Sequence, residues 1–92
     1  MNQITFESFK AEKLAMGYDE VLTREWAPHW ENDTHEHPFD ADVLIVQGEM
    51  WLTLQGQTQH LQAGERFKVA KHVPHAEKYG AHGALFWVAR KN

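Results

Sequence analysis

The chain has 92 residues, a formal net charge of −4 at pH 7 and 42% hydrophobic residues, which suffices for one core and excludes the compositions typical of disordered chains. The acidic balance gives no general attraction for nucleic acid, because phosphates favour a basic surface. The chain has no cysteine. Disulfides and thiolate ligands are therefore excluded, and a transition-metal site has to be built from His, Asp and Glu.

The sequence also speaks against a membrane partner. No run approaches the roughly 18 apolar residues of a membrane-spanning helix. Residues 1–5 lack the basic and apolar regions of a signal peptide. We therefore expect a single domain over residues 1–92, in the cytoplasm, with neither nucleic acid nor a membrane among its partners.

The first segment has the pattern of a short helix. Phe6, Phe9 and Leu14 recur at roughly helical spacing. Thr5 is suited to cap the start of this helix, and Gly17 to stop its end. We predict a helical arm over residues 1–17 that packs on the rest of the domain, with an N-terminal strand as the alternative.

From residue 18 onward the apolar residues recur with a period of two. Met50, Leu52 and Leu54 share one face of a predicted strand, and Phe67 and Val69 alternate with charged residues. No stretch of this region has the pattern of the long helices that parallel strands need as crossovers. The pattern predicts an all-β, antiparallel sandwich or barrel over residues 18–92.

Three glycines divide this region into short segments. Gly48, Gly56 and Gly64 fall eight residues apart. We predict that each marks a hairpin turn between strands.

The strongest chemical signal is a pair of histidines at His35 and His37. On a strand, residues i and i+2 point to the same face about 6.5–7 Å apart. Two imidazoles at such positions can bind one ion through metal–nitrogen bonds of roughly 2.0–2.1 Å. This H-x-H pattern is weak by itself, since it also occurs on ordinary protein surfaces.

The residues that follow strengthen the signal. The segment 35–48 resembles the first motif of the cupin family, with two histidines, a carboxylate, a hydrophobic strand and a glycine turn. The segment 64–75 resembles the second cupin motif, with a glycine, an alternating strand, a turn and then proline-histidine. The resemblance implies a cupin-type antiparallel β-barrel, or jelly roll, with His35, His37 and His75 as metal ligands.

The sequence also differs from the cupin motifs at several positions. The position of the usual cupin glutamate ligand falls on Ala41, and Asp40 and Asp42 beside it point away from the face of His37 on a regular strand. The usual final asparagine corresponds to Tyr79. For Asp42 a solvated position outside the barrel is favoured, because only a bulge would turn this side chain inward.

A glutamate two residues after His75 is a possible substitute for the usual cupin glutamate ligand. Glu77 and Tyr79 have the same parity as His75, so a regular strand directs all three into the barrel. Glu77 is then a candidate fourth ligand, a partner for the second nitrogen of a ligand imidazole, or a partner for Lys or Arg. Tyr79 and Asp42 complete the set of candidate pocket or fourth-ligand residues.

These residues support two main functions. The first is a small metal-binding cupin that binds or acts on a small molecule, with one divalent ion of Fe, Mn, Ni, Cu or Zn. The second is a ligand-binding or sensor cupin without an essential metal. A barrel with remnant histidines is a third interpretation. No nucleophile–base pair names a reaction, so the sequence leaves open whether the protein is an enzyme.

The composition also predicts an assembly. Four Trp and five Phe are many for one small core to cover. A small barrel in addition leaves strand edges that are usually covered or paired. We therefore expect a homodimer.

Overall fold

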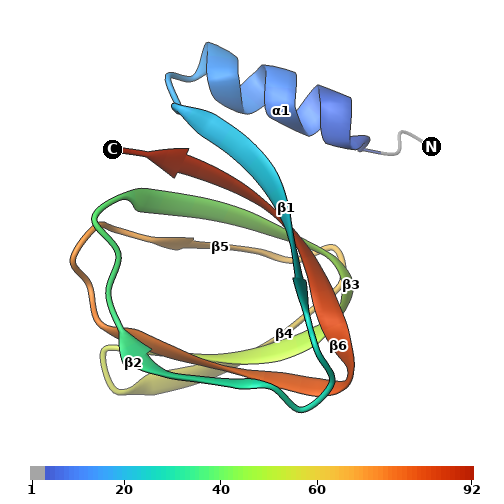
Figure 1. The fold of residues 1–92 in the computed structure, drawn as a ribbon, viewed down its shortest axis with the longest axis vertical. Helices are drawn as coiled ribbons and strands as arrows, with labels where there is room; N and C mark the ends of the chain where they lie inside the picture. The colour runs from blue at the N-terminus through green and yellow to red at the C-terminus, as the bar shows by residue number, and fades with distance from the viewer. Residues whose placement is uncertain (1–3) are drawn as a thin grey trace.

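The computed structural model describes residues 4–92, so residues 1–3 of the predicted arm lie outside the described part. One helix precedes six strands that form a single antiparallel sheet. The sheet curls into a flattened barrel of two layers, with the helix outside it (Figure 1). The predicted all-β architecture with a short N-terminal helix is confirmed. The elements are α1 (Phe6–Ala15), β1 (Glu20–Trp26), β2 (Glu31–His35), β3 (Asp40–Leu54), β4 (Gln57–Gln62), β5 (Arg66–Val69) and β6 (His75–Lys91).

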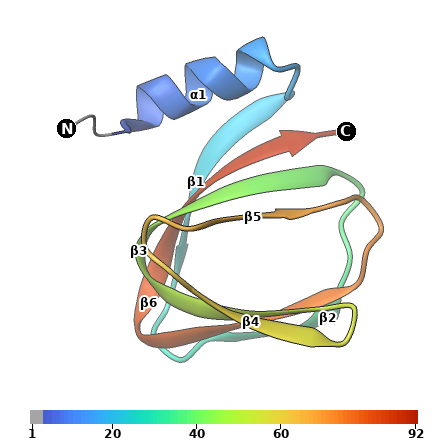
Figure 2. The same ribbon diagram turned by 180° about the vertical axis from the view of Figure 1, so that it is seen from behind.

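The two longest strands, β3 and β6, pair with each other and take part in both layers. The first part of β3 pairs with β5 and its second part with β4. The first part of β6 pairs with β2 and its second part with β1. Figure 2 shows the same arrangement from behind. The first residues of β6 therefore lie beside β2, which brings two separate histidine segments together.

The long strands bend where two glycines meet. Gly48 has φ +83° and Gly83 has φ +67°, and a Cβ on Gly48 would lie 2.1 Å from the carbonyl oxygen of Gly83. The register of β3 shifts between Ile45 and Met50, so the inward parity of the strand changes there. The prediction of a hairpin turn at Gly48 is wrong. Gly48 forms a bulge within β3, where only glycine allows the close backbone contact.

Gly56 lies in a hairpin turn, as predicted, whereas the turn at Gly64 is not a hairpin, because β4 and β5 each pair with β3 and not with each other. Gln55 and Gly56 both have positive φ between β3 and β4, which is the geometry of a two-residue hairpin loop. Gly64 has φ +93° between β4 and β5.

The inward residues of the two layers form the main core. The predicted inward faces of 50–54 and 67–69 both contribute to it. Its buried members are Ala41, Val43, Ile45, Met50, Leu52, Leu61, Tyr79, Ala84, Phe86 and Val88. A second, smaller cluster (Phe9, Val21, Leu44 and Ala89) lies between α1 and the outer face of the barrel.

The helix begins at the predicted cap. The side chain of Thr5 accepts a hydrogen bond from the backbone N–H of Ser8, and the Ser8 side chain accepts one from the N–H of Thr5. Gly17, with φ +96°, follows the last helical turn. No helix among residues 4–92 is long and apolar enough to cross a membrane.

The prediction that Leu14 belongs to the packed face of the helix is wrong. Leu14 is 43% exposed, and Lys13 is buried in its place. The Nζ atom of Lys13 lies 2.7 Å from Oδ2 of Asp42, whose side chain points to the outer face of the barrel. Asp42 is 1% exposed, so the predicted solvated position is also wrong. The helix covers this carboxylate and supplies the cation that compensates its burial.

Candidate metal site

The three predicted histidines come together at one end of the barrel. His35 is the last residue of β2 and His75 the first residue of β6, and the two are paired directly across the strands. His37 lies beyond the end of β2 and not on a strand as we expected. The rings nevertheless converge, with centroids 4.4 Å apart for His35–His75, 4.7 Å for His35–His37 and 5.0 Å for His37–His75.

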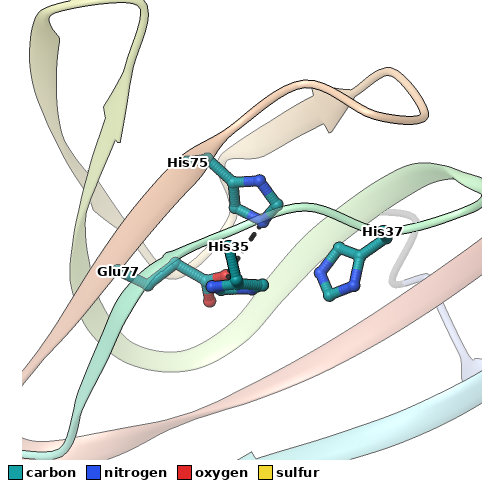
Figure 3. A group of neighbouring side chains, drawn as sticks. All are labelled: His35, His37, His75 and Glu77. Carbon is teal, nitrogen blue, oxygen red and sulfur yellow. Dashed lines mark ion pairs between the residues drawn. The ribbon is translucent and has the colours of Figure 1, made fainter.

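A carboxylate joins the three imidazoles. Oε1 of Glu77 lies 3.4 Å from Nε2 of His75 and 3.8 Å from Nε2 of His35. One candidate ligand atom from each of the four side chains lies within 4.8 Å of the other three. Figure 3 shows the four side chains around one small space. We refer to them as the His3Glu cluster.

The dimensions of the His3Glu cluster fit a metal ion. Two donors bound to one ion at roughly 2.0–2.1 Å are at most about 4.2 Å apart. The shortest donor separations lie within this limit, and the 4.8 Å bound exceeds it by only a few tenths of an ångström. Small side-chain movements therefore bring all four donors to one ion.

Backbone hydrogen bonds orient two of the imidazoles. Nδ1 of His35 is 2.7 Å from the carbonyl oxygen of Asp33, and Nδ1 of His75 is 3.0 Å from that of Val73. Because a carbonyl only accepts, each Nδ1 carries the proton and donates it. In the neutral form of each imidazole, Nε2 then carries a lone pair on the side of the cluster. This is the orientation in which metal-ligating histidines are usually held.

Tyr79 holds the carboxylate from the other side. Its hydroxyl donates a hydrogen bond to Oε2 of Glu77, and its ring stacks on Trp26 with centroids 5.0 Å apart. Burial, followed by the charge of Glu77, raises the pKa of Tyr79, so the phenol stays protonated and acts as a donor. Glu77 and Tyr79 both face the interior, as their parity predicts. Tyr79 thus orients the candidate ligand Glu77.

The charges of the cluster follow from these contacts. Burial, and then the neighbouring His75 and His35, lower the pKa of His37, which favours its neutral form. The hydrogen bond with Glu77 raises the pKa of His75, and burial opposes this only in part. Burial acts to raise the pKa of Glu77, but the hydrogen bonds with His75 and Tyr79 outweigh it and lower the pKa. Glu77 is therefore ionised at neutral pH.

Ala41, at the position of the usual cupin glutamate, and its neighbour Asp42 lie on opposite faces of β3. Ala41 is buried in the barrel and lines the cavity at the cluster, where its methyl group offers no ligand atom. Asp42 points outward and pairs with Lys13. Asp42 therefore lies apart from the four residues that converge.

A cavity of about 80 Å³ adjoins the His3Glu cluster. Its walls are mostly apolar and aromatic, and include Trp26, Phe39 and Phe67. Two of its lining residues, Arg24 on β1 and Arg90 on β6, were not predicted from the sequence. Arg90 shares the parity of the buried Phe86 and Val88, which was the available signal, but its charge suggested a surface position.

Sequence comparisons give no relative, whereas structural comparisons give many. No protein-family model matches the chain, and no curated protein is similar to it in sequence. The chain is similar to KdgF from Halomonas sp. (TM-score 0.68, 17% identity, 79% of this chain and 68% of that one). It is also similar to an RmlC-like cupin from Shewanella frigidimarina (TM-score 0.69, 23% identity, 79% and 66%). A third similar structure is the cupin domain of Schizosaccharomyces pombe Cnp3 (TM-score 0.74, 14% identity, 83% and 57%).

These similarities establish the fold. All three identities lie below 25%, and the chain spans 57–68% of the lengths of these proteins. The barrel is a cupin fold, as the two sequence motifs indicated. A shared fold leaves the function to be argued from the site itself.

Proposed function

We propose that this cupin-fold chain holds one divalent transition-metal ion in its barrel and uses the site to bind a small molecule. The ligands are the imidazoles of His35, His37 and His75 and the carboxylate of Glu77. The observation that carries the proposal is the convergence of these four donors, with two Nε2 atoms oriented by backbone hydrogen bonds. Such partly buried, oriented donor sets are typical of metal sites.

The donor types narrow the choice of metal. Three imidazole nitrogens and one carboxylate oxygen suit Fe, Mn, Ni, Cu or Zn better than the all-oxygen ligands of Mg or Ca. When bound, such an ion polarises an oxygen of a ligand or lowers the pKa of bound water. The protein's own residues orient the ligands through Tyr79 and restrict water through the apolar cavity wall.

A binding domain without an essential metal is the second candidate. It is favoured by one contact: Glu77 already has a partner at each oxygen, namely Tyr79 at Oε2 and His75 at Oε1. A protonated His75 therefore stabilises the buried carboxylate when no ion is present. The two candidates differ in whether metal displaces this proton.

Elemental analysis of protein purified without an affinity tag tests the proposal. We expect close to one transition-metal ion per chain in the wild type, and loss of that ion in each of His35→Ala, His37→Ala and His75→Ala. His60→Ala is the matched control, because His60 is exposed and stacks on Trp51 at the outer face. A folded wild type that takes up no ion from any of the five metals contradicts the proposal and favours the metal-free binding domain.

A further inference from the structure

We propose that the cavity beside the His3Glu cluster binds the carboxylate group of a short-chain organic acid, with Arg90 and Arg24 as its cationic partners. This deepens the proposed function and rests on it for the small-molecule role of the cavity. The arginine contacts themselves do not require the metal. The charges of the residues that line the cavity support this proposal.

Positive charge exceeds negative charge around this cavity. Its ionised lining residues are Arg24, Arg90 and Glu77. The one lining carboxylate is already engaged by Tyr79 and His75. Glu20, which lies outside the lining, pairs with Nη1 of Arg90 at 3.1 Å and offsets part of its charge. A divalent ion in the cluster makes the cavity still more positive. Such an excess favours an anion.

Arg90 has donor capacity that the protein leaves unused. Its guanidinium lies over the ring of Phe39, 4.5 Å from the centroid, and its Nη1 donates to Glu20 at 3.1 Å. Its Nε is buried and has no hydrogen-bond partner among the described residues. A buried donor without a partner is costly, so a small rotation that brings Nε to a carboxylate in the cavity is favoured. A guanidinium binds a carboxylate with two parallel bonds.

The position of Arg90 places it next to the metal cluster. Its register partner on β3 is Ala41, whose small side chain also lines the cavity and leaves room beside the guanidinium. The Phe39 ring that Arg90 covers also stacks on His37, with centroids 4.7 Å apart. An anion at Arg90 therefore lies beside the proposed ion.

The β1 side of the cavity, like the side of Arg90, has an arginine over an aromatic ring and a buried donor without a partner. The guanidinium of Arg24 lies over the ring of Trp26, 4.9 Å from the centroid. Nε1 of Trp26 is a second buried donor without a partner among the described residues. The remaining wall is apolar, and includes Val43, Phe67 and Val69. The cavity, of about 80 Å³, is small, which favours a short acid with an apolar body.

The test titrates acetate into metal-loaded and metal-free protein, with acetamide as its uncharged analogue of the same shape. Calorimetry gives the affinity, and the NMR signal of the Arg90 Nε–H reports contact at that atom. We expect acetate to bind at least tenfold more tightly than acetamide and to shift the Arg90 signal. Arg90→Gln should weaken acetate binding by about tenfold or more, as expected for loss of a charged hydrogen-bond partner.

Arg66→Gln is the matched control. Arg66 is exposed and its guanidinium lies near Phe9 at the outer face, 5.9 Å from the ring centroid. Its substitution should leave acetate binding unchanged. Arg90→Lys keeps the charge but loses the forked donors, and should give an intermediate affinity. If Arg90→Gln does not fold, Arg24→Gln tests the same cavity from β1 and should also weaken acetate binding.

The metal content of each sample, measured separately, distinguishes the two proposals. Arg90-dependent acetate binding by a wild-type protein that takes up none of the five metals supports the inference and contradicts the metal site. Metal-loaded protein that binds acetate no better than acetamide supports the metal site and overturns the inference. Acetate binding that Arg90→Gln and Arg24→Gln leave unchanged overturns it as well.

Discussion

The Glu77 carboxylate is shared between Tyr79 and His75. The hydroxyl of Tyr79 donates to Oε2, and Nε2 of His75 lies 3.4 Å from Oε1. Both partners come from β6, at the inward positions on either side of Glu77. Alternation along one strand thus sets a ligand, its orienting hydroxyl and a second ligand in a row.

We expect Tyr79→Phe to weaken metal binding by roughly 10- to 100-fold, because partners that orient a metal ligand typically contribute this much. The ring and its stacking on Trp26 are retained, so the protein should remain folded. Competition with a chelator measures the affinity. Tyr18→Phe is the control, since the Tyr18 hydroxyl faces Asp42 at 3.4 Å on the outer side of the barrel. Equal affinities in the two variants would show that the Tyr79 hydroxyl does not orient Glu77.

We expect Asp42→Asn to leave the metal content per folded chain unchanged while it destabilises the protein. The substitution leaves the buried ammonium of Lys13 without its anion, which typically costs about 3–5 kcal/mol. Urea unfolding measures the free energy of unfolding. The double variant Lys13→Met with Asp42→Asn should recover part of the loss. If Asp42→Asn empties the site in folded protein, Asp42 contributes to metal binding after all.

Metal occupancy should fall as the pH is lowered. An imidazole binds a metal only when it has lost its proton from the donor nitrogen. The raised pKa of His75 means that protons compete for this ligand already above the ordinary value of about 6.5, whereas the lowered pKa of His37 keeps that ligand neutral. Metal retained after dialysis at a series of pH values gives the profile. Full occupancy at pH 5 contradicts this expectation.

The metal-free protein should show the opposite trend near neutral pH. A folded-state pKa of His75 above its unfolded value stabilises the fold fully below about pH 6.5, and this contribution is lost as the pH rises through the folded pKa. The lowered pKa of Glu77 contributes stability above about pH 4.5, which is lost as the pH falls through the folded pKa. The lowered pKa of His37 acts in the opposite sense, because its contribution is lost as the pH falls below about 6.5. Thermal unfolding of chelator-treated protein gives the profile, which is the balance of these three groups. His75→Gln should flatten the upper part of the profile.

We expect Gly48→Ala to destabilise the fold severely. The new Cβ meets backbone at 2.1 Å, and φ at this position is +83°. Gly56→Ala is the control, because Gly56 has a similar φ of +79° but no atom within 4 Å of the place that the new methyl group would take. The control should lose only about 1 kcal/mol, the usual cost of alanine in this backbone region. Equal unfolding free energies for the two variants would argue against a close contact of β3 with β6.

The homodimer stays a prediction. Trp30 is 52% exposed, and Ile4, Leu14 and Met16 are exposed as well, so apolar surface is present among the described residues. Sedimentation equilibrium at tens of micromolar protein should give twice the mass of the 10.7 kDa chain. A mass of one chain contradicts the prediction.

The sequence by itself determined the local features of this protein. The period of two set which residues of each strand face inward, and it directed His75, Glu77 and Tyr79 to one side. The cap at Thr5 and the turns at Gly56 and Gly64 were also predictable, because each depends on neighbours within a few residues. The two motifs further indicated the cupin fold and the three histidines.

Only the tertiary structure decided the features that depend on distant segments. Burial of Asp42 requires Lys13, which lies 29 residues earlier in the chain. Gly48 forms a bulge instead of a turn because β3 continues past it to meet Gly83 of β6. Arg24 and Arg90 line one cavity because β1 pairs with β6. Charge and alternation give each residue a preference for one face, but the packing of the two layers and the helix decides what covers that face.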